Sequence, residues 1–158
     1  MQLTKKDISK ILSLKEEHWK YGKQSQLKHF KKNYKKNDIN NCIFKGKNLI
    51  GYTALKNRRY FYKKKEYFLF DALIIKKKFQ KKKLSRLLME FNNLIINFYE
   101  KPSFLLCEKK MVNFYKLFGW KRARNVVVKD SLTNKLVMSF NFKNKLKNKD
   151  KIEIYLNR

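Results

Sequence analysis

The chain has 158 residues, and its 41 Lys and Arg against 12 Asp and Glu give a formal net charge of +29. Hydrophobic residues make up 43% of it, enough to bury a core, so disorder of the whole chain is excluded. The length suits one domain, no apolar run approaches the roughly 18 residues of a membrane span, and the first residues lack the apolar core of a signal peptide. We therefore expect a soluble, cytoplasmic protein.

Lysine supplies most of the positive charge, because only six of the 41 basic residues are Arg. Proteins that read nucleic acids usually concentrate Arg, whose planar fork matches phosphates and guanine edges. Two interpretations stay open: a solvated Lys surface that reflects a biased coding sequence, or selection for an anionic partner. Cys42 and Cys107 lie far apart and have no His at metal spacing, so neither a disulfide framework nor a metal site is indicated.

The N-terminal residues predict two helices. Thr4 and Asp7 have the spacing of a capping box and precede apolar residues at helical spacing, which predicts a helix to about Trp19. A second helix is expected after Gly22, with Ser25 as its N-cap.

A hairpin and a long buried strand are expected next. The turn-forming residues 45–48 separate short strand-like segments at 41–44 and 49–55. In 67–75 both alternating sets of side chains are apolar except for Asp71, which indicates a central strand covered on both faces. A carboxylate there needs a hydrogen bond, a pKa shift or a cleft, so Asp71 is a candidate functional residue; pairing with a Lys is the structural alternative.

The following segment predicts a long helix and then a parallel strand. Apolar residues recur at helical spacing over 84–99 and predict one continuous buried face. That face comprises Leu84, Leu87, Leu88, Phe91, Ile95 and Phe98. Pro102 ends the helix and starts a strand at 103–107, which completes a right-handed crossover.

The C-terminal part predicts a short helix and a hairpin. The helix ends at Gly119, and strands at 123–129 and 135–142 form the hairpin. We therefore expect a single domain over 1–142 and a basic C-terminal tail over 143–158, in which 152–156 has the alternation of an added edge strand.

This order of elements is similar to that of the GNAT superfamily of N-acetyltransferases, and two segments carry the resemblance. Residues 73–88 resemble the acetyl-CoA signature, in which Arg or Gln follows five positions after an aliphatic strand end and precedes x-x-Gly-x-Gly or Ala. Gln80 fits this pattern, while Lys83 and Ser85 stand at the two glycine positions. Residues 104–122 resemble the later signature of Phe-Tyr followed by Gly and an aromatic, with an ending like that of the aminoglycoside 2′-N-acetyltransferase group.

The resemblance implies an α/β GNAT fold: a mixed, mostly antiparallel sheet with flanking helices, whose central strands at 67–75 and 103–107 splay apart. It implies acetyl-CoA as co-substrate, paired with strand backbone through its pantetheine arm and held at its pyrophosphate by the amides of 81–86. The residues it assigns to cofactor binding are Leu73, Ile74, Ile75, Gln80, Lys81, Lys82, Lys83, Leu84, Ser85, Arg86 and Glu108. Glu108 stands where the family has Asn.

The resemblance also implies two catalytic residues. Tyr115 takes the position of the tyrosine that protonates the departing thiolate, and Asp71 that of an acid that draws the amine proton through water. The implied activity is direct acetyl transfer in a ternary complex to a primary amine of a small molecule. The charge of +29 repels polycations, so we expect a neutral or anionic acceptor, such as a nucleotide-linked amino sugar or an amino acid derivative.

A binding function is the alternative. A catalytically weak GNAT-like module would bind nucleic acid or another polyanion through its Lys-rich surface, and the aromatics interleaved with Lys in 58–68 would stack bases. The structural interpretation of the same stretch is a strand end with Lys flanks that prevent edge pairing. A monomer and a homodimer are both compatible with the sequence.

Overall fold

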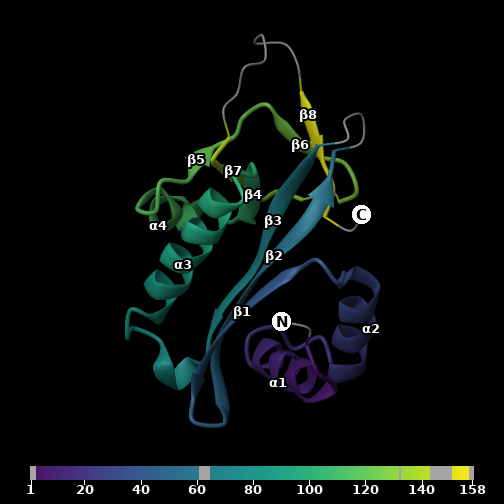
Figure 1. The fold of residues 1–158 in the computed structure, drawn as a ribbon, viewed down its shortest axis with the longest axis vertical. Helices are drawn as coiled ribbons and strands as arrows, with labels where there is room; N and C mark the ends of the chain where they lie inside the picture. The colour runs from purple at the N-terminus through teal and green to yellow at the C-terminus, as the bar shows by residue number, and fades with distance from the viewer. Residues whose placement is uncertain (1–2, 61–64, 132, 143–150, 157–158) are drawn as a thin grey trace. The chain divides into compact units, whose positions relative to one another are not determined.

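A computed structural model describes residues 3–60, 65–131, 133–142 and 151–156 (Figure 1). In chain order the elements are α1 (Lys5–Glu16), α2 (Lys23–Asn33), β1 (Ile39–Lys45), β2 (Asn48–Arg59), β3 (Glu66–Ile75), the 3₁₀ helix η1 (Lys77–Phe79), α3 (Leu84–Phe98), β4 (Ser103–Cys107), the 3₁₀ helix η2 (Lys109–Met111), α4 (Val112–Lys116), β5 (Lys121–Arg122), β6 (Val126–Val128), β7 (Leu136–Phe140) and β8 (Ile152–Ile154). Across these residues the strands form a six-stranded sheet of order β1-β2-β3-β4-β7-β5 and a two-stranded sheet of β6 and β8. This is the predicted mixed α/β architecture, with helices beside a mostly antiparallel sheet.

The residue contacts divide the chain into two compact units. Unit 1 comprises Met1–Lys56 and Asp71–Asn92, and unit 2 comprises Asn57–Phe70 and Asn93–Arg158. Since β2, β3 and α3 each run through a boundary between these segments, every one of them contributes residues to both units. No helix in the described residues is long and apolar enough to cross a membrane.

The helices of unit 1 begin at short-range hydrogen bonds. The predicted capping box is confirmed: Asp7 N donates to Thr4 Oγ1 at 3.2 Å, and Thr4 N donates to Asp7 Oδ2 at 3.0 Å. The prediction that Ser25 caps α2 is wrong, because the helix starts at Lys23 and its N-cap is Gly22, three residues earlier. Gly22 takes the left-handed φ of 81°, and its N–H donates to Glu16 Oε1 at 3.2 Å, which fixes the turn between the two helices.

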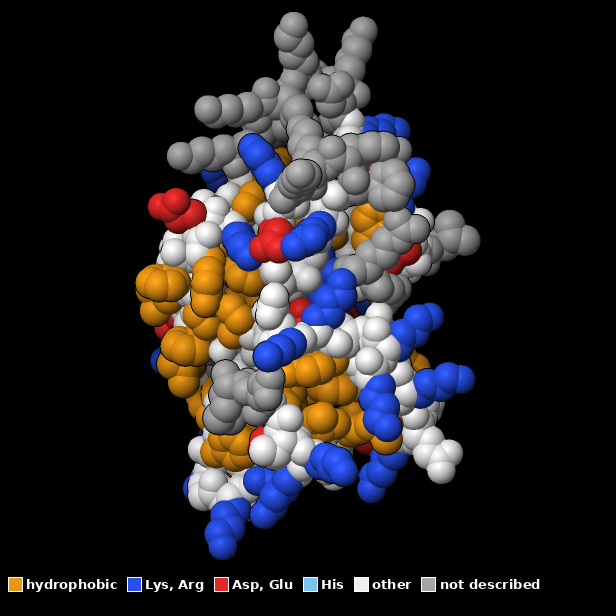
Figure 2. Space-filling view, turned by 45° about the vertical axis from the view of Figure 1, so that its right-hand side comes forward, with side chains coloured by type: hydrophobic (Ala, Val, Ile, Leu, Met, Phe, Trp, Pro, Cys, Tyr) orange, Lys and Arg blue, Asp and Glu red, His pale blue; other side chains and the backbone are white. Residues whose placement is uncertain are grey.

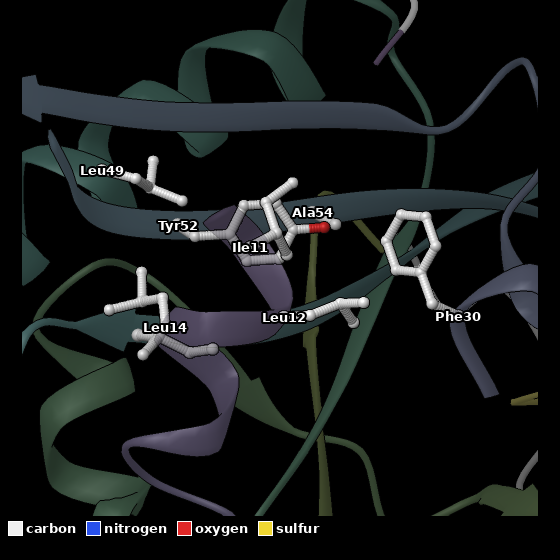
Figure 3. Packing of buried hydrophobic residues seen from close by; sticks show 8 residues of the cluster. Ile11, Leu12, Leu14, Phe30, Leu49, Tyr52 and Ala54 are labelled. Atoms are coloured by element: carbon white, nitrogen blue, oxygen red, sulfur yellow. The ribbon is translucent and has the colours of Figure 1, made fainter. Parts of the chain in front are cut away.

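The core of unit 1 lies between these helices and the first strands (Figure 3). β1 and β2 form the predicted antiparallel hairpin, with Ile39 opposite Leu55 and Lys45 opposite Asn48. The buried residues of this core are Ile11, Leu12, Leu14, Phe30, Leu49, Tyr52, Ala54 and Ile74. Tyr52 and Ala54 are alternate residues of β2 and face this core, and all of residues 49–55 are buried, so both faces of the strand are covered here.

Unit 2 contains the first half of β3, all of β4 and the C-terminal strands. β3 and β4 are parallel, and their ladder has two pairs, Phe68 with Ser103 and Leu69 with Phe104, a short pairing of the kind predicted for strands that splay. β4 continues antiparallel to β7 along its whole length. The predicted final hairpin is wrong in its first strand: β7 pairs with β5 at 121–122, and β6, within the predicted strand 123–129, does not join it. β6 pairs with β8 instead, and its Val126 is buried in the core that contains Ile154, with Val128 packed against it.

Residues 152–156 belong to the core of unit 2. Of the predicted tail over 143–158, residues 151–156 lie in the described part, and 143–150 and 157–158 lie outside it. β8 pairs with β6 in parallel, and Ile154 is fully buried. The hydroxyl of Tyr67 donates to Tyr155 O at 2.9 Å and accepts from Tyr155 N at 2.8 Å, so a buried side chain of β3 holds this segment.

Helix α3 forms where it was predicted, but part of its predicted buried face is exposed. Leu88, Met89 and Ile96 are buried, whereas Leu87, Phe91 and Phe98 of the predicted face are 54%, 50% and 81% exposed. Apolar residues form two separate stripes along this helix, so helical spacing alone did not distinguish the stripe that the fold buries.

Candidate active site

The loop between β3 and α3 has a backbone that normally requires glycine. Lys81 and Lys83 adopt left-handed φ angles of 64° and 58°, which L-residues avoid because of their Cβ atoms. Lys83 stands at a glycine position of the acetyl-CoA signature, and α3 begins at the next residue. The chain thus keeps the glycine conformation in this loop although a lysine occupies the position.

Positive charge collects on this loop. The Nζ atoms of Lys45, Lys78 and Lys82 lie 5.7, 5.3 and 5.5 Å from the centre of the Phe79 ring. Three ammonium groups around one ring repel one another, and the N-terminus of α3 adds partial positive charge with no acidic residue in its first turn. Such an arrangement attracts an anion. Elsewhere Lys and Arg side chains are scattered over the visible face (Figure 2).

The predicted backbone ligands lie directly after an irregularity in β3. Ala72 has a φ of 60°, so the alternation of the strand breaks and Asp71, Ala72 and Leu73 are all half-buried. Ile74 and Ile75 are buried again. The carbonyl oxygen of Ile75 lies 2.9 Å from His18 Nε2 and accepts from Gln80 Nε2 at 3.4 Å. Gln80, predicted from its spacing, therefore ties the basic loop to the end of β3.

The remaining predicted cofactor residues lie at two helix starts. Leu84, Ser85 and Arg86 form the first turn of α3, where Ser85 is half-buried and the exposed Arg86 lies 3.9 Å from Glu90. Glu108 follows β4, caps η2 and pairs with Lys110 at 2.7 Å. The side chain of Glu108 is exposed. The hydrogen bond from Lys110 and the positive charge of Lys110 lower the pKa of the Glu108 carboxyl.

Asp71 forms an ion pair with a lysine of the neighbouring strand β2. Lys56 Nζ lies 2.8 Å from Asp71 Oδ2, the structural alternative that the sequence had left open. Burial would raise the pKa of Asp71, but the charges of Lys56 and Lys15 outweigh it and hold that pKa at about 2. The carboxylate is therefore ionised at neutral pH and is a weak base.

A small polar pocket of unit 1 contains this ion pair. Its volume is about 20 Å³, room for about one water molecule. The lining residues are Lys15, His29, Phe30, Asn33, Tyr34, Asp38, Asn40, Tyr52, Ala54, Lys56 and Asp71. Burial is the main cause that lowers the pKa of Lys15. Sequence reasoning missed Lys15, Lys56 and His29; the only signal was that Lys56 follows Tyr52 and Ala54 on the same face of a strand.

Tyr115 lies on α4 in unit 2 and is buried. Its ring meets those of Phe70 and Phe114 edge-on, with centroids 6.4 and 5.3 Å away. Burial, helped by the nearby Cys107, raises the pKa of Tyr115 to about 12, so its hydroxyl keeps its proton at neutral pH. A tyrosine in this state can donate a proton, and its aromatic contacts also give it a place in the core.

The aromatics of 58–68 serve the core as far as the structure describes them. Tyr67 and Phe68 are buried, and Tyr60 packs on Tyr67 with ring centroids 4.8 Å apart. The predicted stacking surface for bases is thus occupied by intramolecular contacts at these residues, while Phe61 and Tyr62 lie outside the described part.

Comparisons with known proteins bear on the fold. No protein-family model matches the sequence, and no curated protein does. Among solved structures, the GNAT family N-acetyltransferase YhbS of Escherichia coli in complex with CoA is similar at a TM-score of 0.72 and 13% identity, over 98% of this chain and 86% of that one. The chain has the GNAT fold.

Two further structures with this fold were crystallised with coenzyme A. The PaiA N-acetyltransferase of Thermoplasma acidophilum matches at a TM-score of 0.58 and 17% identity, over 88% of this chain and 95% of that one. An aminoglycoside 6′-N-acetyltransferase matches at a TM-score of 0.64 and 12% identity, over 87% and 91%. At such identities the likeness concerns the fold, so the chemistry has to be argued from this chain's own residues.

Proposed function

We propose that the chain is an acetyl-CoA-dependent N-acetyltransferase that acts on a primary amine of a small, neutral or anionic molecule. The observation that carries this proposal is the left-handed backbone of Lys81 and Lys83 at the start of α3. Backbone strain of this kind persists where a loop has to present its amides to a ligand. In this chain the strained Lys83 stands at a glycine position of the acetyl-CoA signature, and solved structures with the same fold contain coenzyme A.

The residues of the loop fit the phosphates of coenzyme A. The amides of 81–86 would hold the pyrophosphate, because the left-handed residues and the first turn of α3 leave backbone N–H groups for an anion. Lys45, Lys78 and Lys82 around Phe79 would neutralise further phosphate charge, and that charge would relieve their mutual repulsion. Leu73, Ile74 and Ile75 would pair with the pantetheine arm.

Acetyl-CoA supplies an acetyl group activated as a thioester. The free amine attacks the carbonyl carbon, the C–N bond forms, the C–S bond breaks, and Tyr115 gives its proton to the departing sulfur. With a pKa of about 2, Asp71 is too weak a base to take a proton from an ammonium group outright. Its part is to orient the amine by accepting a hydrogen bond from it, and water carries the proton away. Most of the rate gain then comes from orientation.

The charges around Asp71 argue against a polycationic acceptor. Two lysines, Lys15 and Lys56, line the pocket together with the two carboxylates of Asp38 and Asp71, so no excess of negative charge is left to attract a polyamine or an aminoglycoside. The net charge of +29 repels such molecules over a longer range. A neutral amine, or one that carries a carboxylate or a phosphate, meets no such barrier.

Cofactor binding is tested by thermal unfolding with and without acetyl-CoA. We expect the ligand to raise Tm in the parent chain and in Lys77→Ala, which changes a loop lysine outside the group around Phe79. Ser85→Phe places a bulky side chain in the first turn of α3 and should abolish the ligand-induced rise while the unliganded Tm stays close to that of the parent. An undiminished rise in Ser85→Phe would contradict the assignment of this loop.

The acceptor class is tested by thiol release from acetyl-CoA with a panel of amines at low and moderate salt. Salt should lower kcat/KM for anionic acceptors, whose attraction it screens, and raise the small values for polycations, whose repulsion it screens. Efficient acetylation of a polycation at low ionic strength would refute the proposed acceptor class and leave the cofactor assignment standing.

A further inference from the structure

Helix α3 carries a second apolar stripe that the fold leaves exposed. Leu87, Phe91, Leu94 and Phe98 are 54%, 50%, 67% and 81% exposed. On a helix of 3.6 residues per turn they fall within about 60° of one another and lie roughly opposite the buried Met89 and Ile96. A helix that is apolar on both sides is normally covered on both sides. We propose that this stripe is the interface of a homodimer, in which α3 of one copy packs antiparallel against α3 of the other.

The spacing of the stripe is self-complementary. Successive members are four, three and four residues apart, so the pattern reads the same in both directions. In an antiparallel pair about a two-fold axis, Leu87 meets Phe98 of the second copy and Phe91 meets its Leu94. Every layer then combines one Leu with one Phe, and the 3-4 alternation is that of a coiled-coil seam. A two-fold interface needs a surface that fits itself, and this stripe meets that condition.

The distribution of charge also favours a second copy of this chain as the partner and an antiparallel arrangement of the two helices. Residues 87–99 contain no Lys or Arg in a chain that has 41, so this stripe is the place where two copies of a +29 protein can approach. A parallel pair would bring the basic N-terminal ends of the two helices together. The antiparallel pair instead brings Arg86 toward Glu100 of the other copy.

The area suits a reversible dimer. Four Leu and Phe side chains exposed by half or more present roughly 400–500 Å² of apolar surface, the size of a patch that marks an interaction site. A standard interface takes about 800 Å² from each partner, so the stripe supplies its apolar centre and flanking residues supply the rest. We therefore expect a dimer that dissociates on dilution.

The first test is mass in solution, measured by sedimentation velocity over a roughly hundredfold range of concentration. The parent chain should reach twice its 19.4 kDa, and Leu94→Lys should stay monomeric. Tyr21→Lys is the matched control: Tyr21 is 72% exposed, against 67% for Leu94, so the same charge at the same exposure should leave the dimer intact. A monomeric parent at all concentrations, including one that binds lipid vesicles instead, overturns the proposal, as does a dimeric Leu94→Lys.

The second test determines the register in which the two α3 helices pack. It does not require a variant with a charged residue in the stripe to fold. In a Cys42→Ser background, Leu87→Cys and Phe98→Cys chains are oxidised separately and as a mixture. Eleven residues of helix span about 16 Å, so neither chain should crosslink with itself, since a disulfide needs Cα atoms within about 7 Å. The mixture should crosslink. Crosslinking of Leu87→Cys alone, or none in the mixture, refutes the antiparallel pair.

Discussion

Replacing Lys83 by glycine should stabilise the protein, although it removes a side chain. The φ of 58° costs an L-residue about 1–2 kcal/mol, which glycine does not pay. Glycine loses about 0.5–1 kcal/mol more conformational entropy on folding, so the net gain is about 0.5–1 kcal/mol. Lys82 is the matched control, because it precedes Lys83, carries the same charge and is absent from the residues with positive φ. Lys82→Gly should therefore lose about 0.5–1 kcal/mol.

The two variants should differ in Tm by roughly 3–6 °C in a protein of this size, with Lys83→Gly the more stable. Thermal unfolding followed by circular dichroism measures this difference, and each variant removes one positive charge from the loop. Repeating the scan with acetyl-CoA should show an undiminished ligand-induced rise in Lys83→Gly, since the backbone amide is retained. If Lys83→Gly is no more stable than Lys82→Gly, the left-handed loop does not exist in solution and the reasoning fails.

Three more predictions concern the tyrosine proposed as the proton donor, Tyr115, and two polar contacts of unit 2. Tyr115→Phe should lower kcat by roughly 10²-fold with acetyl-CoA affinity nearly unchanged, as steady-state kinetics and calorimetry can show; equal losses in both would mark a structural residue. Hydrogen bonds from Lys101 at 2.6 Å and from Asn57 lower the pKa of Glu66 from 4.5 to about 2. Because the folded pKa is depressed, this stability is present above pH 4.5 and is lost as the pH falls toward 2. Lys101→Met should cost about 1–2 kcal/mol at pH 7 after solvent screening and flatten urea stability over that range, and an unchanged pH profile would rule the pair out as its cause. Asn93→Leu removes the acceptor of the buried Trp120 Nε1, 3.0 Å away, and should cost about 1–3 kcal/mol in urea unfolding; a loss below 0.5 kcal/mol would mean that water replaces the amide.

Local signals predicted most of the fold. The capping box of Thr4 and Asp7, the hairpin turn at 45–48 and the doubly apolar strand at 67–75 all depend on neighbours in sequence, and the structure confirms each of them. The start of α2 was missed because Gly22 takes its cap position through a hydrogen bond to Glu16, a contact that no capping motif encodes.

The candidate site was predicted less completely. Gln80 and Lys83 could be placed by motif spacing, and Asp71 by the cost of a carboxylate in an apolar strand. The partners of Asp71 come from a neighbouring strand and from a helix more than 50 residues earlier, so only tertiary structure brings them together. The same holds for the two apolar stripes of α3: periodicity detects both and cannot say which one the sheet covers.

The double hydrogen bond between Tyr67 and Tyr155 has a consequence for the order in which the chain folds during synthesis. Its two residues are 88 positions apart, so at roughly 5–20 residues per second the ribosome needs several seconds to make the partner of Tyr67. Unit 1, by contrast, has all its residues once Asn92 has been added. The nascent chain can thus close its N-terminal core early, while the buried hydroxyl of Tyr67 and its aromatic neighbours wait for β8. In that interval the apolar side chains of this part of β3 lack their native C-terminal partners.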